Sequence, residues 1–193
     1  MILPLSFYRR DDVVQISREL LGKYLVTRIH GKLTSGIITE TEAYAGITDK
    51  ASHAYGGKRT ARTETMYAEG GVAYVYLCYG IHHLFNVVTN TENIPHAVLI
   101  RAVQPQEGLE TILKRRGMNK PVPNLSAGPG TASQALGITL QNNGLALTGD
   151  KVWIEDRCLI IKPSSIVTGT RIGVDYAGKD AKRPYRFLIK TKF

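Results

Sequence analysis

Two strongly β-forming segments separated by a glycine constrain this chain more than any other feature. The first covers residues 72–79, the second covers residues 82–89, and Gly80 lies between them. β-branched and aromatic residues dominate both segments, and a glycine permits a tight turn. The pattern predicts a two-stranded ribbon with Tyr79, Gly80 and Ile81 at its tip.

A tyrosine at such a tip packs poorly into its own core. In one interpretation Tyr79 folds back over the sheet. In the other it protrudes, flanked by Ile81, and wedges between the bases of DNA. The adjacent His82 and His83 point to opposite faces of a strand, so they are poor joint metal ligands.

A second informative stretch begins where the apolar run 36–38 ends. Side chains two apart share a face of a strand, so Glu40, Glu42 and Tyr44 are expected to point the same way. Two carboxylates about 7 Å apart, partly desolvated, raise one pKa and serve acid/base hydrolysis. The alternative is a solvated strand face near a sheet edge.

The loop that follows combines aromatic rings, glycines and positive charge. It carries His53, Tyr55, Gly56, Gly57, Lys58, Arg59 and Arg62. Stackable rings and fixed cations on a flexible backbone are what a protein needs to grip a nucleotide. We therefore interpret residues 40–62 as the centre of the chemistry.

Arg101 stands inside the apolar strand predicted over residues 97–103. A charge there is unfavourable unless a carboxylate or phosphate meets it, and Glu42 is the candidate partner. Alternatively, Arg101 lies at an exposed strand edge.

Composition frames these motifs. The 193 residues carry a formal net charge of +9, which fits either a nucleic-acid partner or a merely basic soluble protein. The two cysteines lack metal-ligand spacing, and no secretion signal or membrane-spanning segment is recognisable. We expect a single domain over residues 1–193, in the cytoplasm at the nucleoid, without membrane association.

Local signals place the remaining elements. Helices are predicted after Asp12, over 109–116 and over 132–136. Gly128 and Gly130 precede the last of these helices, whose N-terminal amides could hold a phosphate. A strand is predicted over 151–162, with Trp153 and Ile160 in the core. The fold class is α/β, more closely α+β mixed: a curved mixed or antiparallel sheet with surrounding helices and a protruding β-hairpin.

Several motifs, in order and with compatible spacing from about residue 11 to 187, resemble one family. They are Glu-Thr-Glu-Ala-Tyr from Glu40 with the downstream His53, the Tyr-Val-Tyr-x-x-Tyr-Gly hairpin, Asn86, Leu-Ile-Arg-Ala around Arg101, Gly-Pro-Gly at 128–130 and Arg-Ile-Gly-Val-Asp-Tyr-Ala-Gly from Arg171. The chain resembles the alkyladenine (3-methyladenine) DNA glycosylases of base-excision repair and has the size of a bacterial member.

The resemblance implies the catalytic roles. Glu42 would be the general base that activates a water, and Arg101 and the backbone carbonyl of Ile172 would position that water. No lysine lies within this constellation as a matched nucleophile, so simple hydrolysis without strand cleavage is expected, with no metal or cofactor.

It also implies the binding roles. Tyr44, His53 and Tyr76 would sandwich an extruded purine, backbone groups near Ala51 would read its edge, and Asn86 would exclude guanine. Tyr79, with Ile81 beside it, would fill the gap left in the duplex. From the residue types themselves we expect further DNA contacts at Lys58, Arg59, Arg62, Gly128, Gly130 and Arg171. The implied partner is double-stranded DNA with damaged purines (3-methyladenine, 7-methylguanine, hypoxanthine), bound by a monomer.

Three positions depart from the family pattern. Ile81 replaces the methionine of animal members, Lys58 replaces an arginine, and Thr131 replaces a lysine. Two other functions remain open. A non-catalytic nucleic-acid-binding module would not need Glu42 beside Arg101, and a metal-dependent hydrolase would need a histidine and carboxylate cluster that the spacing does not offer.

Overall fold

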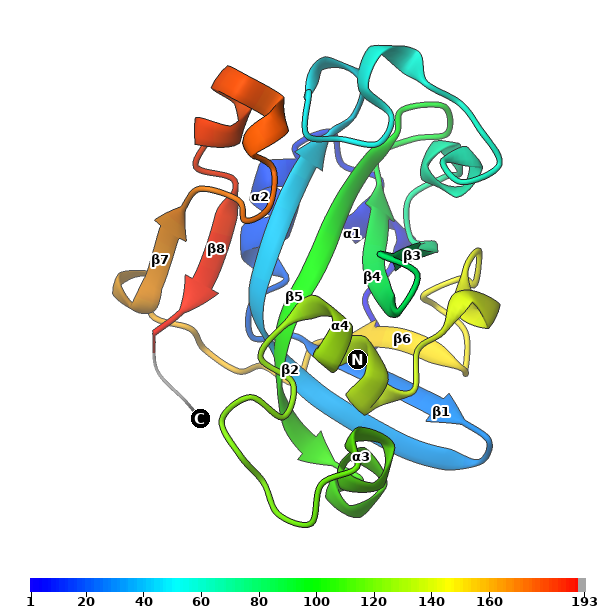
Figure 1. Cartoon of the computed structure of the whole chain (residues 1–193), viewed down its shortest axis with the longest axis vertical. Coiled ribbons are helices and arrows are strands. Elements are labelled where there is room, and N and C mark those ends of the chain that lie inside the picture. The colour runs from blue at the N-terminus through cyan, green and yellow to red at the C-terminus, as the bar shows by residue number, and fades with distance from the viewer. Residues whose placement is uncertain (191–193) are drawn as a thin grey trace.

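One curved antiparallel sheet organises the molecule (Figure 1), and the computed structural model describes residues 1–190. Within this range eight strands pair in the order β3-β4-β5-β2-β1-β6, and β8 joins both β2 and β7. The strands are β1 (Tyr24–Ile29), β2 (Lys32–Ala45), β3 (Ala73–Cys78), β4 (His82–Thr89), β5 (His96–Glu107), β6 (Val152–Glu155), β7 (Ile166–Gly169) and β8 (Arg186–Ile189). The predicted fold class is confirmed, and every strand pairing in this range is antiparallel.

The 14-residue strand β2 is the axis of the sheet. It pairs with β5 along its length, with β1 in its first half and with β8 over residues 40–42. The register of β2 against β5 shifts on both sides of Glu40, and Arg101 is the unpaired extra residue of β5. Bulges bend a strand and change the direction of its side chains. This irregularity lies where the side chains of Glu40, Glu42 and Arg101 contact one another.

Short helices cover both faces of the sheet. They are α1 (Leu5–Tyr8), α2 (Val13–Glu19), α3 (Leu109–Arg116) and α4 (Pro129–Leu136). In Figure 1, α1 and α2 lie behind the sheet and α4 lies in front of it. The Asp12 carboxylate caps α2 by accepting the Gln15 amide at 2.8 Å, as predicted. None of the helices within residues 1–190 is long and apolar enough to cross a membrane.

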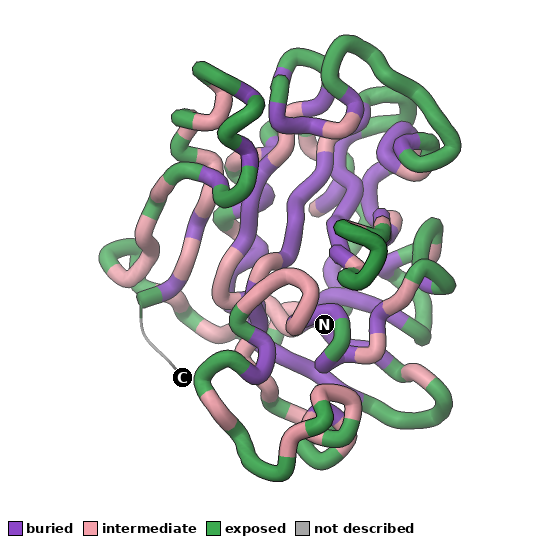
Figure 2. Tube along the Cα trace, viewed as in Figure 1, coloured by how far each residue is buried: buried purple, intermediate pink, exposed green. Residues whose placement is uncertain are grey.

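The core lies between the sheet and these helices, and the outer loops are exposed (Figure 2). Most strand residues pack into the core, but the turn of the β3–β4 hairpin protrudes from it. Tyr79 at this turn is 91% exposed with a left-handed φ of 50°, and Ile81 is 72% exposed. The protruding hairpin is thereby confirmed, and the interpretation in which Tyr79 folds back over the sheet is wrong.

The strand predicted over residues 151–162 is much shorter than expected. β6 ends at Glu155, and Ile160 is 86% exposed, so only Trp153 is a core residue as predicted. The Asp156 carboxylate accepts the Cys158 amide at 2.8 Å, and Cys158 has a φ of 60°. This turn takes the chain away from β1, so the later apolar residues find no strand to pair with.

Candidate active site

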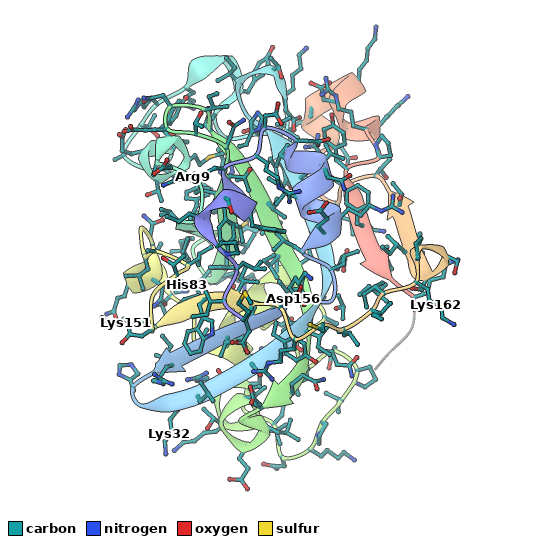
Figure 3. All side chains as sticks on the ribbon, turned by 180° about the vertical axis from the view of Figure 1, so that it is seen from behind. Arg9, Lys32, His83, Lys151, Asp156 and Lys162 are labelled. Carbon is teal, nitrogen blue, oxygen red and sulfur yellow. The ribbon has the colours of Figure 1, made fainter. Side chains whose placement is uncertain are left out.

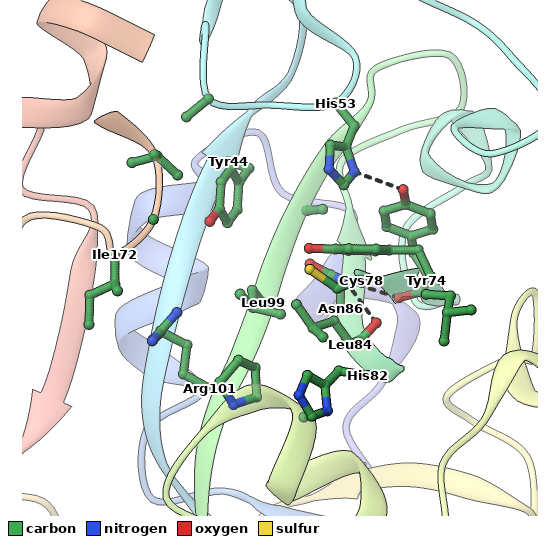
Figure 4. A pocket seen from close by; sticks show the side chains of 18 of the residues that line it. Tyr44, His53, Tyr74, Cys78, His82, Leu84, Asn86, Leu99, Arg101 and Ile172 are labelled. Atoms are coloured by element: carbon green, nitrogen blue, oxygen red, sulfur yellow. Dashed lines mark hydrogen bonds between the residues drawn. The ribbon is translucent and has the colours of Figure 1, made fainter. Parts of the chain in front are cut away.

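A cavity of about 630 Å³ opens where the upper halves of β2 and β5 meet the β3–β4 hairpin. The start of α4 with the preceding Gly128, and residues 172–174 and 176, complete its wall. Figure 4 shows Tyr44 facing His53 and Tyr74 across this space, with Arg101 and His82 along one edge. The volume falls within the range of small-molecule sites, and the aromatic lining suits a flat ring.

Glu42 lies directly behind the cavity wall. It has no exposed surface, and Tyr44, Arg101 and Ile172, which line the cavity, cover it. The Tyr44 hydroxyl donates to Oε2 at 2.8 Å, and the Ile172 amide donates to Oε1 at 2.8 Å. Burial raises the pKa of Glu42, against the opposing effects of Arg101, the Ile172 amide and Tyr44. A carboxylate with a raised pKa beside a ligand-sized cavity is suited to act as a general base.

Arg101 joins the two carboxylates predicted on one strand face. Its Nε donates to Glu40 at 3.0 Å, and its Nη1 lies 3.3 Å from Glu42 Oε1. Glu40 also accepts from Arg186 Nη1 at 3.2 Å, which ties β8 to the site. The expected pairing of Arg101 with Glu42 is confirmed. The alternative of an exposed strand edge is wrong, since the Arg101 side chain is only 12% exposed.

The hydroxyl of Tyr44 can be tested apart from its ring. Burial, followed by the Glu42 charge, raises the pKa of Tyr44 well above its ordinary value, so the hydroxyl remains a donor. Tyr44→Phe removes a group that lowers the pKa of Glu42. Because a base acts when deprotonated, the acidic limb of the rate profile should move up by about one to two pH units.

If Glu42 is the general base that the resemblance implies, a pH profile of the single-turnover reaction rate measures this shift. Tyr76→Phe is the matched control, because it removes a hydroxyl from another cavity ring that has no contact with Glu42. An unchanged profile for Tyr44→Phe would show that its hydroxyl does not control the carboxylate.

Three rings form the cavity wall opposite Tyr44. His53 meets Tyr76 edge-on at 4.7 Å between centroids, and Tyr76 lies 5.4 Å from Tyr74. His53 Nδ1 and the Tyr74 hydroxyl are hydrogen-bonded at 3.0 Å. Burial, and then the charges of Arg62 and Lys58, lower the pKa of His53 to about 4. His53 is therefore neutral at physiological pH and offers an uncharged ring to the cavity.

Asn86 is held rigidly at the cavity. It is 4% exposed, and its Nδ2 donates to the carbonyls of Tyr74 at 3.1 Å and Leu84 at 3.3 Å. Two backbone acceptors fix the amide plane, so the side chain cannot easily swing away from an incoming group.

Arg171 does not lie where we predicted it. It was expected to contact DNA, but its side chain is fully buried and pairs with the Asp49 carboxylate. It also donates to the Ala43 carbonyl at 2.8 Å and lies over the Tyr44 ring. No local signal distinguishes a buried arginine of this kind from a surface one, because its partner is 122 residues away.

The other predicted DNA contacts divide into two groups. Arg62 lies 4.8 Å over the Tyr76 ring and lines the cavity, as do Gly128 and Gly130. The Arg59 guanidinium forms an ion pair with Glu64 at 2.7 Å and donates a hydrogen bond to the Asn93 side chain at 2.9 Å. Lys58 is exposed on the same loop. The cations of the loop therefore differ in how freely they can meet a phosphate.

Tyr176 belongs to the cavity although it is not among the predicted site residues. This residue is 71% exposed and lines the cavity, and its hydroxyl donates to the Ala51 carbonyl at 3.1 Å. The Ala51 amide donates to Asp49 at 3.1 Å. Both backbone groups of Ala51 thus have protein partners, so only the second lone pair of its carbonyl is open to a ligand. The available signal was an aromatic residue four positions after Ile172.

Within residues 1–190, no group of three His, Cys, Asp or Glu side chains gathers as a metal site. The loop histidine His53 bonds to a tyrosine, and His82 packs against Gly130.

Comparison with known proteins agrees with this geometry. A family model described as methylpurine-DNA glycosylase matches residues 6–193. A protein of Chlamydia felis is 51% identical over 99% of this chain and 97% of its own, and one of Clostridium perfringens is 45% identical over 98% and 96%. Both carry the name "Putative 3-methyladenine DNA glycosylase".

The family model and these relatives define an enzyme of the N-glycosylase class, which hydrolyses N-glycosyl bonds in DNA repair. The chain belongs to the methylpurine-DNA glycosylase family.

Proposed function

We propose that this enzyme turns alkylated or deaminated purines, of the 3-methyladenine, 7-methylguanine and hypoxanthine class, out of duplex DNA and hydrolyses their N-glycosidic bond. The observation that carries the proposal is the position of Glu42. It is buried behind the ring-lined cavity and held by Tyr44, the Ile172 amide and Arg101. A binding module without catalysis would have no use for a carboxylate kept in this way.

The proposed reaction is a hydrolysis. A water between Glu42 and the sugar attacks the anomeric carbon as the bond to the base breaks, and the bonding electron pair leaves with the base nitrogen. Glu42 takes the proton of the water, and its negative charge stabilises the oxocarbenium-like sugar. Arg101 holds the carboxylate in place and, as a cavity-lining group, positions the water, as does the carbonyl of Ile172.

Recognition follows from the cavity walls. A purine placed between Tyr44 and the His53–Tyr76 side would gain roughly 1–3 kcal/mol per stacking contact, which offsets the cost of unstacking it. Damaged bases pair weakly and cost less to extrude. The fixed amide of Asn86 supports steric exclusion of a purine with an amino group at position 2, as in guanine.

The decisive experiment is single-turnover release of base from duplex oligonucleotides containing hypoxanthine or 3-methyladenine, in the presence of EDTA. We expect release from the lesion and none from a matched undamaged duplex. Lesion binding without release would favour the alternative, a non-catalytic damaged-DNA-binding module. Base release that occurs without EDTA and is lost when EDTA is added would favour metal-dependent hydrolysis.

The hairpin tip gives a separate prediction about DNA binding. Tyr79 is 91% exposed at the cavity mouth, so its replacement costs no core packing. If its ring fills the gap left by the extruded base, Tyr79→Ser should weaken lesion-duplex binding by about 5- to 150-fold, the equivalent of one stacking contact. Equilibrium binding to a fluorescent lesion duplex measures the change. Ile160→Ser, at an apolar residue that is 86% exposed and does not line the cavity, is the control and should bind as wild type.

A further inference from the structure

A second cavity of about 610 Å³ lies on the other side of the β3–β4 hairpin. The β1–β2 turn, the end of α4 and the segment 139–142 form its wall. Its lining includes Arg28, His30, His83 and Lys151. Figure 3 shows His83 and Lys151 at the same edge of the molecule, and Lys162 at the opposite edge. The reaction described above uses none of these groups.

The charge of this second cavity is entirely positive. Arg28 and Lys151 carry fixed charge, His30 and His83 add ring N–H donors, and no carboxylate belongs to the lining. Within residues 1–190 none of the four side chains forms an ion pair with a carboxylate. Arg28 instead lies over the Trp153 ring, with its guanidinium carbon 5.5 Å from the ring centroid. Cations that converge without an anion repel one another, and a bound anion relieves that repulsion.

The β1–β2 turn supplies one of these four side chains. His30 forms the β1–β2 turn with Gly31, and its φ is 51°. Histidine, like asparagine and aspartate, tolerates this left-handed conformation, and the turn leaves the His30 ring at the second cavity.

The two cavities are connected through the fold. His82 lines the first cavity and His83 the second, because neighbours on β4 point to opposite faces. Helix α4 spans the same interval: Gly128–Thr131 line the first cavity at its start, and Gly137 lines the second at its end. Its eight residues cover about 12 Å. A phosphate about 12 Å along a duplex from the extruded base lies roughly four base pairs away, at 3.4 Å per base pair.

We propose that the second cavity binds the phosphodiester backbone of the same DNA duplex, on one flank, about four base pairs from the extruded base. This inference rests on the proposed function, because it requires the lesion to sit in the first cavity. The contact would add sequence-independent affinity and fix the orientation of the duplex, as phosphate contacts do.

Salt-dependent DNA binding tests the site independently of base release. Arg28→Gln combined with Lys151→Gln removes two fixed charges from the second cavity. With ten base pairs on both sides of the lesion, the slope of log affinity against log salt should decrease by about two, because each phosphate contact contributes roughly 0.9. Lys162→Gln combined with Lys190→Gln removes the same charge from exposed positions away from this cavity and should leave the slope unchanged.

Duplex length then locates the contact. Two further duplexes keep ten base pairs on one side of the lesion and only three, closed by a hairpin, on the other. The duplex that is short on the flank contacted by the second cavity cannot reach it, so wild type and the Arg28/Lys151 double variant should bind that duplex with equal affinity. The duplex that is short on the other flank keeps the contact, so the two proteins should differ in their affinity for it. His30→Asn, which suits the left-handed backbone, should reproduce part of the loss without affecting folding.

Several outcomes overturn the proposal. One is an equal effect of the cavity variant and its charge-matched control on the symmetric duplex. Another is binding of inorganic phosphate or pyrophosphate that depends on Arg28 and Lys151 while duplex length has no effect, which would assign the cavity to small phosphates. Flank-dependent binding without any base release would support this site and reject the proposed catalysis, so the two failures are distinguishable.

Discussion

Replacement of Glu42 by glutamine is expected to slow base release by about 10³- to 10⁴-fold, the contribution of a positioned base together with its charge. Glutamine has the same shape, and it can still accept from the Ile172 amide and meet the Tyr44 hydroxyl. Lesion binding should therefore stay within a few-fold of wild type. Single-turnover release and equilibrium binding, measured on the same duplex, separate the two effects.

Glu107→Gln is the matched control for this experiment. Like Glu42, Glu107 pairs with an arginine, Arg157, at 2.8 Å, and it accepts a hydrogen bond from Ser35 of β2 at 2.6 Å. Unlike Glu42, it lies away from the cavity wall. Its release rate should equal that of wild type. Full activity of Glu42→Gln would refute the proposed mechanism, and equal losses in both variants would indicate a general effect of removing a paired carboxylate from the sheet.

The second large effect is expected at Asp49. Asp49→Ala should lower the free energy of unfolding by about 3–5 kcal/mol, because it leaves the buried Arg171 guanidinium without its carboxylate. The Ala45 and Ala51 amides lose their acceptor as well. For a chain of this length the melting temperature should fall by roughly 10 °C. Denaturant and thermal unfolding measure both quantities.

An exposed ion pair provides the comparison for Asp49. Glu64→Ala removes the partner of Arg59 on the surface, where solvent screens the charges, and should leave the unfolding midpoint nearly unchanged. Asp49→Asn together with Arg171→Met removes both buried charges and should recover part of the lost stability. If Asp49→Ala were no less stable than Glu64→Ala, the buried pair would not hold the loop 46–57 in place.

Local patterns were sufficient for much of the site. Alternation along a strand predicts that Glu40, Glu42 and Tyr44 share a face, and the structure connects them through Arg101 and hydrogen bonds. The hairpin with Tyr79 at its tip follows from β propensity and one glycine. These features depend on neighbours within a few residues, which the sequence displays directly.

Other features depend on contacts between distant segments. The β2–β5 bulge aims Arg101 at both carboxylates, and Ile172 reaches Glu42 across 130 residues. Arg171 is a buried partner of Asp49 rather than the predicted DNA contact, and Ile160 is exposed although its segment looks like a core strand.

The sequence by itself therefore determined the hairpin, the strand face that carries Glu40, Glu42 and Tyr44, and the residue types of the candidate active site. Only the tertiary structure decided that Arg171 is buried and paired with Asp49, how Tyr176 and Ala51 meet, and that Arg28, His30, His83 and Lys151 share a cavity. The physical reason is that secondary structure follows from local sterics and side-chain periodicity. Burial and ion pairing are set by where the sheet brings remote segments together.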